Sequence, residues 1–134
     1  MALPGTTGLT AYCAGLVQDF LCGRAPTPPA GFWYALGSAG SAASGITELV
    51  GGGYARTQVA FARATSGREA NTQTITVGPA TGNPWSVAAV ALLDAQTAGN
   101  CLIVFVPDEV ITVPVGEAVT IDVSTLTFGF AITS

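Results

Sequence analysis

The spacing of apolar residues along the chain changes from helical near the N-terminus to alternating in the rest. Apolar side chains three and four positions apart predict one helix over residues 7–22, with Thr6 or Thr7 as its N-cap and Gly23 at its C-terminus. The predicted buried stripe of this helix consists of Leu9, Cys13, Leu16, Val17 and Phe20. Residues 24–30 contain three prolines and predict a stiff connector, because proline has no backbone N–H to donate.

Residues 31–134 predict short strands separated by turn-forming residues. The aromatic segment 31–36 is expected to be a central strand, and the Gly-, Ser- and Ala-rich segment 37–45 a flexible loop. Clean alternation in residues 124–133 predicts a last strand that pairs within a sheet. About eight strands after one helix predict a mainly β fold, an antiparallel, jelly-roll-like β-sandwich formed by residues 1–134 as a single domain.

A glycine turn followed by a long predicted strand, residues 51–64, is the stretch around which the rest is expected to be organised. Side chains alternate along a strand, so Tyr54, Arg56 and Gln58 share one face. The other face carries Ala55, Val59 and Phe61. In a chain with so few charges, Arg56 is expected to be paired or to hold backbone carbonyls, with Glu48 the nearest acidic candidate. We hypothesise that Arg56 locks the glycine turn.

Residues 94–100 predict a hairpin loop between two apolar runs, 85–93 and 101–106. Asp94 can accept a hydrogen bond from the backbone ahead of it, and Gly99 can adopt a positive φ. Both runs are apolar on two faces, which must be covered by the core on one side and by another layer or subunit on the other. The candidate interface residues are Trp85, Val90, Leu92, Leu102 and Val104.

The composition is poor in charge, with 9% charged and 49% apolar residues, against about 25% charged in a typical domain. We infer that much of the surface faces other protein, including copies of the chain as a trimer or pentamer. A net charge of −4 without lysine argues against nucleic-acid binding, and no apolar run approaches the roughly 20 residues of a membrane-spanning helix. The N-terminus resembles no secretion signal, so synthesis in a cytoplasm is expected. Cys13, Cys22 and Cys101 are interpreted as reduced, buried fillers.

The residues that common enzyme mechanisms need are missing. Without histidine or lysine the chain lacks the commonest general base, so we expect no enzyme, no cofactor and no metal. Asp108 and Glu109 are adjacent and interpreted as a solvated turn. An alternative is a glycan-binding module, in which aromatic side chains stack on sugar; the candidates are Trp33, Tyr54 and Trp85.

Several segments together resemble a family of small tailed-phage virion proteins, with relatives in gene transfer agents. The similar segments are residues 16–21, 32–36, 52–56, 92–95, 99–102 and 113–126. The most specific parts are a Gly-Gly-Tyr-Ala-Arg motif, which includes Gly52, Gly53, Tyr54 and Arg56, and the hairpin with Asp94 and Gly99. Members are variously tail-fibre adaptor, minor tail, head-decoration or head-spike proteins.

The resemblance implies a non-enzymatic structural protein of the virion, made in the host cytoplasm. The leading expectation is a capsid-surface accessory protein, a decoration, cement or spike-base subunit that binds the major capsid protein and its own copies. The alternative is a tail-fibre adaptor or minor tail protein that binds other virion proteins. The segment 37–45 lacks the acidic, proline-containing turn expected of the family.

Overall fold

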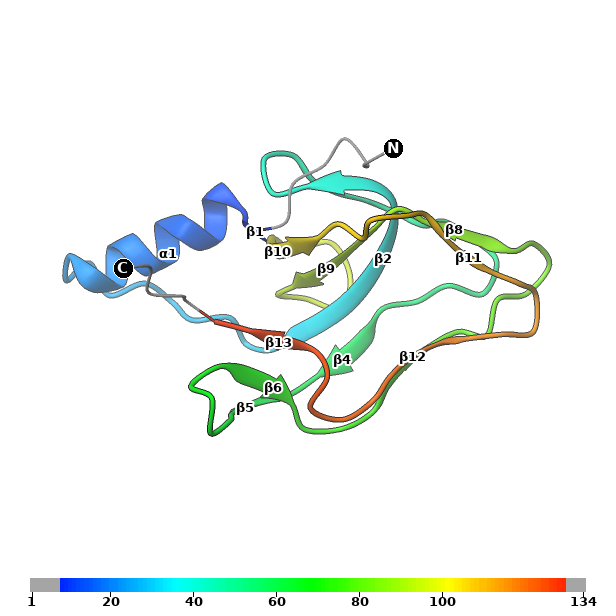
Figure 1. Ribbon diagram of the computed structural model, residues 1–134. Coiled ribbons are helices and arrows are strands. Elements are labelled where there is room, and N and C mark those ends of the chain that lie inside the picture. Colours follow the sequence, from blue (N-terminus) through cyan, green and yellow to red (C-terminus); the bar gives the residue numbers. More distant parts are fainter. Residues whose placement is uncertain (1–7, 130–134) are drawn as a thin grey trace.

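The computed structural model describes residues 8–129, which form one helix and thirteen strands in four antiparallel sheets (Figure 1). The predicted mainly β, antiparallel, sandwich-like fold with one N-terminal helix is confirmed, although the strands are shorter and more numerous than the eight expected. The elements are β1 Gly8–Leu9, α1 Ala11–Leu21, β2 Phe32–Ser41, β3 Gly45–Glu48, β4 Thr57–Val59, β5 Phe61–Arg63, β6 Glu69–Asn71, β7 Ile75–Val77, β8 Trp85–Val87, β9 Ala89–Leu93, β10 Cys101–Phe105, β11 Ile111–Val113, β12 Val119–Ile121 and β13 Thr127–Phe128.

The helix α1 begins at Ala11, later than the spacing of apolar residues predicts. Its N-cap is Thr10, whose Oγ1 accepts a hydrogen bond from the Cys13 amide at 3.2 Å and donates one to the Cys101 carbonyl at 2.6 Å. The predicted caps Thr6 and Thr7 lie outside the described residues. The helix starts late because the preceding residues form β1, which pairs with β10, a contact that local spacing does not reveal. The C-terminal glycine, Gly23, has a φ of 76° as expected.

Strand β2 is the central strand of the largest sheet, as predicted. The sheet runs in the order β1-β10-β9-β2-β3, and β4 also pairs with β2. The prediction of a flexible loop over residues 37–45 is wrong, because β2 continues to Ser41 and forms a hairpin with β3. Small residues there extend the strand instead of ending it.

The largest sheet curls until β3 lies against β10, although β9 and β2 separate them in the sheet. Figure 1 shows that β2 is long and bends along with the curled sheet. Small side chains line the inside, so the backbones can approach closely. This inner cluster consists of Ala35, Ala89, Ala91, Leu93 and Val104, with Ile46, Cys101 and Val106 packed against it. The chain therefore covers the second face of its apolar strands itself.

Gly37 permits the curl, and replacing it with alanine is expected to lower the free energy of unfolding by about 1–3 kcal/mol. A Cβ at this position would lie 2.4 Å from Ile46 Cγ1 and 2.7 Å from the Thr47 carbonyl oxygen, which belongs to the backbone of β3 and cannot move freely. Urea denaturation followed by circular dichroism measures the change. The matched control is Gly15→Ala in α1, where a Cβ meets nothing within 4 Å; it should be neutral or stabilising by up to about 1 kcal/mol. Equal effects of the two substitutions would contradict the role of Gly37.

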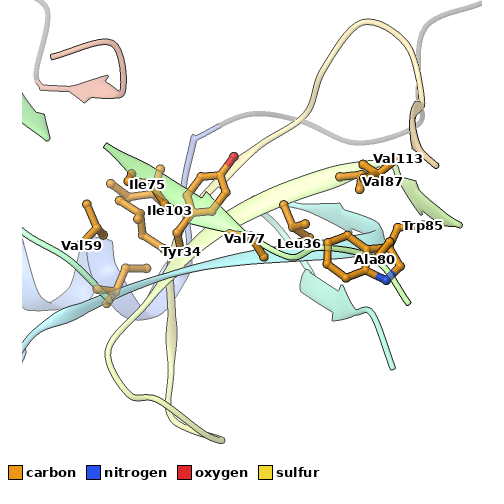
Figure 2. Close-up of a cluster of buried hydrophobic side chains, with 12 residues drawn as sticks. Tyr34, Leu36, Val59, Ile75, Val77, Ala80, Trp85, Val87, Ile103 and Val113 are labelled. Carbon is orange, nitrogen blue, oxygen red and sulfur yellow. The ribbon is translucent and has the colours of Figure 1, made fainter. Parts of the chain in front are cut away.

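The segment with β7 and β8 pairs along its length with the segment with β11 and β12, and the two together cover the other face of the largest sheet. Strand β7 pairs with β12 and β8 with β11, and Ala80 continues the pairing at the corner through backbone bonds of 2.9 and 2.8 Å to Glu117 and Gly116. Figure 2 shows the main core beneath them, with Trp85, Val87 and Val113 at one end and Val59 and Ile75 at the other. Ile75 and Val77 alternate with Thr76 along β7, so both share its buried face.

The long strand predicted over residues 54–64 is instead two short strands in different sheets. Strand β4 pairs with β2, and β5 pairs with β6, which also pairs with β13. The chain bends at Ala60, whose carbonyl accepts a bond of 3.0 Å from the Thr72 amide. The predicted pairing of the last strand is confirmed for Thr127 and Phe128. Residues 124–126 form a turn instead of the predicted strand, and residues 130–133 lie outside the described residues.

The predicted interface through the two-faced apolar strands is corrected by the structure. Trp85, Leu92, Leu102 and Val104 are at most 4% exposed, because the curled sheet and the paired segments enclose them. These four side chains are not available to a partner subunit. Val90 is partly buried and packs against the main core.

The three cysteines are free thiols. Cys13 and Cys101 are partly buried, and burial raises the pKa of both thiols. Cys22, which follows the last residue of α1, is exposed and is therefore not the buried filler expected from the sequence.

Candidate functional site: the Arg56 clamp

The turn before β4 requires glycine for two reasons: its backbone conformation, and its close contacts with neighbouring side chains. Gly52 and Gly53 have φ values of 62° and 76°, in the left-handed region. A Cβ on Gly52 would lie 2.8 Å from Trp85 Nε1, and one on Gly53 would lie 2.7 Å from Thr81 Oγ1. Trp85 Nε1 donates to the Gly52 carbonyl at 3.0 Å, and the ring packs edge-to-face on Tyr54. The turn is thus fixed against the main core.

Arg56 holds three separate parts of the chain together. Its Nε donates to Glu48 Oε2 at 2.7 Å and its Nη2 to Glu48 Oε1 at 2.8 Å, a two-pronged ion pair. Its Nη1 donates to the carbonyls of Ala95 at 2.7 Å and Ala98 at 2.8 Å. The Arg56 side chain is only 7% exposed. We call this arrangement of Glu48, Tyr54, Arg56 and the two carbonyls the Arg56 clamp; the pairing of Arg56 with Glu48 is the one predicted.

Tyr54 completes the Arg56 clamp by joining it to the central strand. Its hydroxyl donates to Glu48 Oε2 at 2.5 Å and accepts from the Leu36 amide at 3.1 Å. Burial and the neighbouring carboxylate raise the pKa of Tyr54. The hydrogen bonds from Arg56, opposed in part by burial, hold the pKa of Glu48 below 4.5. The phenol therefore stays neutral and the carboxylate charged near pH 7.

The hairpin loop held by Arg56 has the predicted internal structure. Asp94 Oδ1 accepts from the Asn100 amide at 2.7 Å, and Gly99 has a φ of 77°. Ala98 also adopts a left-handed φ of 53°, which is uncommon for a residue with a side chain, and its carbonyl is one of the two that Arg56 binds. Sequence reasoning foresaw that Arg56 could hold carbonyls. It had no signal for which ones, because they lie 39 and 42 residues away.

An open hollow of 320 Å³ lies beside the Arg56 clamp. It is lined by Glu48, Leu49, Tyr54, Ala55, Arg56, Gln96, Thr97 and Ala98. The charged groups of this hollow bind one another, so they have little capacity left to bind a ligand or to transfer a proton. The arrangement connects β3, the turn before β4 and the β9–β10 loop, which is a structural role.

Acid is expected to weaken the Arg56 clamp. The pKa of Glu48 is below 4.5 in the folded chain and near 4.5 when unfolded, so its contribution is complete above about pH 4.5 and is lost as the pH falls through the lowered value. Thermal denaturation from about pH 7 to about pH 3 should show a larger loss of stability for the natural chain than for Glu48→Gln. Parallel curves for the two proteins would contradict this expectation.

The remaining predictions from the sequence concern glycan binding, a surface turn and metal binding. Trp85 is buried, so it cannot stack on sugar as the glycan-binding alternative requires. Asp108 and Glu109 are exposed in a bend, as predicted. Within residues 8–129 no three metal-ligating side chains come together. The one helix that these residues form is too short to cross a membrane.

The sequence gives no indication of the role of Asn71, which lies in β6 and is 1% exposed. Its side chain binds the backbone of Gln73, Asp122 and Leu126. An asparagine among turn-forming residues gives no sign of such long-range partners.

Comparison with known proteins identifies the family of the chain. No curated protein matches the chain. Residues 8–129 match the family described as podophage GP4 fiber I protein gp80, and this range covers nearly all of the sequence. The chain belongs to this family of phage fibre proteins and is therefore a virion-associated structural protein of a phage.

Proposed function

We propose that the chain is an adaptor that joins a fibre to the phage particle, the tail-fibre alternative from the sequence, and not a decoration of the capsid lattice. The observation that carries the proposal is the match of residues 8–129 to a family of fibre proteins. The partners of such an adaptor are other virion proteins, and the role needs no catalysis or cofactor. The whole chain, 1–134, acts as one β-sandwich domain in this proposal.

The structure supports this role through the way its loops are fixed. An adaptor must transmit force between a fibre and the particle, so the loops between its strands should not move independently. Arg56 binds both Glu48 and the Ala95–Ala98 segment, and Trp85 binds the glycine turn. The Gly-Gly-Tyr-Ala-Arg segment, in this account, makes the adaptor rigid.

Particles assembled without this chain test the proposal. We expect filled heads and tails that lack the fibre, with fibres restored when the purified chain is supplied during assembly. Intact fibres on fragile or leaking heads would instead identify a capsid-stabilising protein and reject the adaptor. A Gly15→Ala chain, in which the added Cβ meets nothing within 4 Å, is the positive control for the added protein.

A further inference from the structure

Strand β11 has one edge without a neighbouring strand. Among the described residues it pairs only with β8, in a two-stranded sheet. In an antiparallel pair, alternate residues turn their amide and carbonyl groups away from the partner strand. No further hydrogen bond between backbone groups joins residues 110–113 to the rest of the described chain. The outward amide and carbonyl groups of β11 can therefore pair with an additional strand.

The side chains along this edge are apolar and exposed. Val110 and Ile111 are adjacent and are 45% and 47% exposed. Edge strands that face solvent are commonly protected by charged side chains, but residues 110–113 carry none. Pro114 ends the edge, because it has no amide to donate. The edge is thus a short, continuous surface suited to contact with another protein.

The core of the chain holds this edge in place. Val113 is 5% exposed and packs in the main core, where Figure 2 shows it beside Val87 of β8. Figure 1 shows β11 on the side of the molecule opposite α1. An additional strand would therefore pair with a fixed template and would not have to order a loop, which lowers the entropic cost of binding.

The charge beside the edge determines which partner fits. Asp108 and Glu109 lie directly before the edge, exposed in a bend, and neither forms an ion pair within residues 8–129. A lysine or arginine of another protein would pair with them. A second copy of this edge would instead bring further carboxylates, because residues 108–122 contain four and no lysine or arginine. Like charges on neighbouring strands are destabilising.

We propose that the edge of β11 binds an extended segment of another virion protein. Apolar side chains of that segment contact Val110 and Ile111, and its lysine or arginine lies beside Asp108 and Glu109. In this mode of recognition the backbone hydrogen bonds supply affinity and the side chains supply specificity. The inference rests on the proposed function and deepens it, since it names the surface through which the adaptor holds its partner.

Nuclear magnetic resonance titration of the full chain with a blocked hexapeptide, Lys-Lys-Val-Thr-Val-Thr, tests the inference. We expect the amide signals of residues 110–113 to shift and those of α1 to stay in place. A peptide with both lysines replaced by glutamate should bind at least about tenfold more weakly. No shift at residues 110–113 with millimolar peptide would overturn the inference.

Two methylated peptides distinguish strand pairing from simple attraction of charge. One carries methyl groups on the valine amides and the other on the threonine amides, so they lose donors on opposite edges of the bound strand. One of the two should bind at least about tenfold more weakly than the other. Equal binding of both peptides would contradict pairing with β11. This comparison uses the natural chain and does not depend on the folding of a variant.

Substitutions in the chain locate the binding surface. Ile111→Thr keeps a β-branched side chain but removes apolar surface, so it should weaken binding of the hexapeptide about tenfold. Asp108→Asn/Glu109→Gln should weaken it at least about threefold. The matched control Val50→Thr, at a 96% exposed valine between β3 and β4, should bind like the natural chain. Equal binding by Ile111→Thr and Val50→Thr would place the site elsewhere and overturn the inference.

Cross-linking in assembled particles separates this inference from the adaptor itself. A photo-reactive amino acid in place of Thr112, which is exposed in β11, should cross-link to another virion protein. A cross-link to a second copy of the chain would overturn the inference. A chain that lies at the base of a fibre without such a cross-link rejects only the strand pairing. A cross-link to another virion protein from a chain that is absent from the fibres rejects only the adaptor.

Discussion

Replacing Arg56 with methionine is expected to lower the free energy of unfolding by about 3–5 kcal/mol. The Arg56 side chain is 7% exposed and that of Glu48 is 27% exposed, so the substitution leaves a poorly hydrated carboxylate without its cation. It also removes the donors to the Ala95 and Ala98 carbonyls. The loss is large because several groups lose their partner at once. Urea denaturation followed by circular dichroism measures it.

Arg63→Met is the matched control for this experiment. Arg63 also pairs with a glutamate, Glu69, but its side chain is 73% exposed. An exposed pair of this kind contributes at most about 1 kcal/mol. If Arg56→Met cost no more than Arg63→Met, the Arg56 clamp would not lock the glycine turn.

The second large effect is expected at Asn71, where substitution by alanine should cost about 3 kcal/mol. Asn71 Nδ2 donates to the Gln73 carbonyl at 2.8 Å and the Asp122 carbonyl at 3.0 Å, and its Oδ1 accepts from the Leu126 amide at 2.9 Å. Three hydrogen bonds of about 1 kcal/mol each are lost in a site that is 1% exposed. Because these bonds fix the segment before β13, hydrogen exchange should accelerate there first.

Asn100→Ala tests whether this cost is specific to the buried position. The Asn100 side chain donates one bond of 3.1 Å to Asp94 at an exposed site, so its removal should cost less than about 1 kcal/mol. Similar denaturation midpoints for Asn71→Ala and Asn100→Ala would show that Asn71 does not anchor the C-terminal segment.

The features that the sequence predicts well depend on neighbouring residues. Glu48 and Arg56 are eight positions apart with a glycine turn between them, so their pairing follows from scarcity of charge and short separation. Asp94 and Gly99 form a loop whose chemistry is contained within seven residues. Alternation places Ile75 and Val77 together in the core. Each of these inferences needs only local geometry.

The features that the sequence does not predict depend on contacts between residues far apart in the chain. Gly37 belongs to a segment that the sequence predicts to be flexible, whereas in the structure it allows one sheet to curl around its own second face. The apolar faces assigned to a partner are therefore enclosed by the chain itself. The apolar stripe of α1 is visible in the sequence, but the exposure of Phe20 at its end is not, because it depends on where the helix leaves the sheet.

Imaging of intact particles by electron cryomicroscopy, with the chain marked by a bound antibody fragment, tests its proposed place in the virion most directly. The adaptor account predicts density for the chain and its marker where each fibre meets the particle. Marker density repeated over the lattice of the head shell, and none at the fibres, would contradict it.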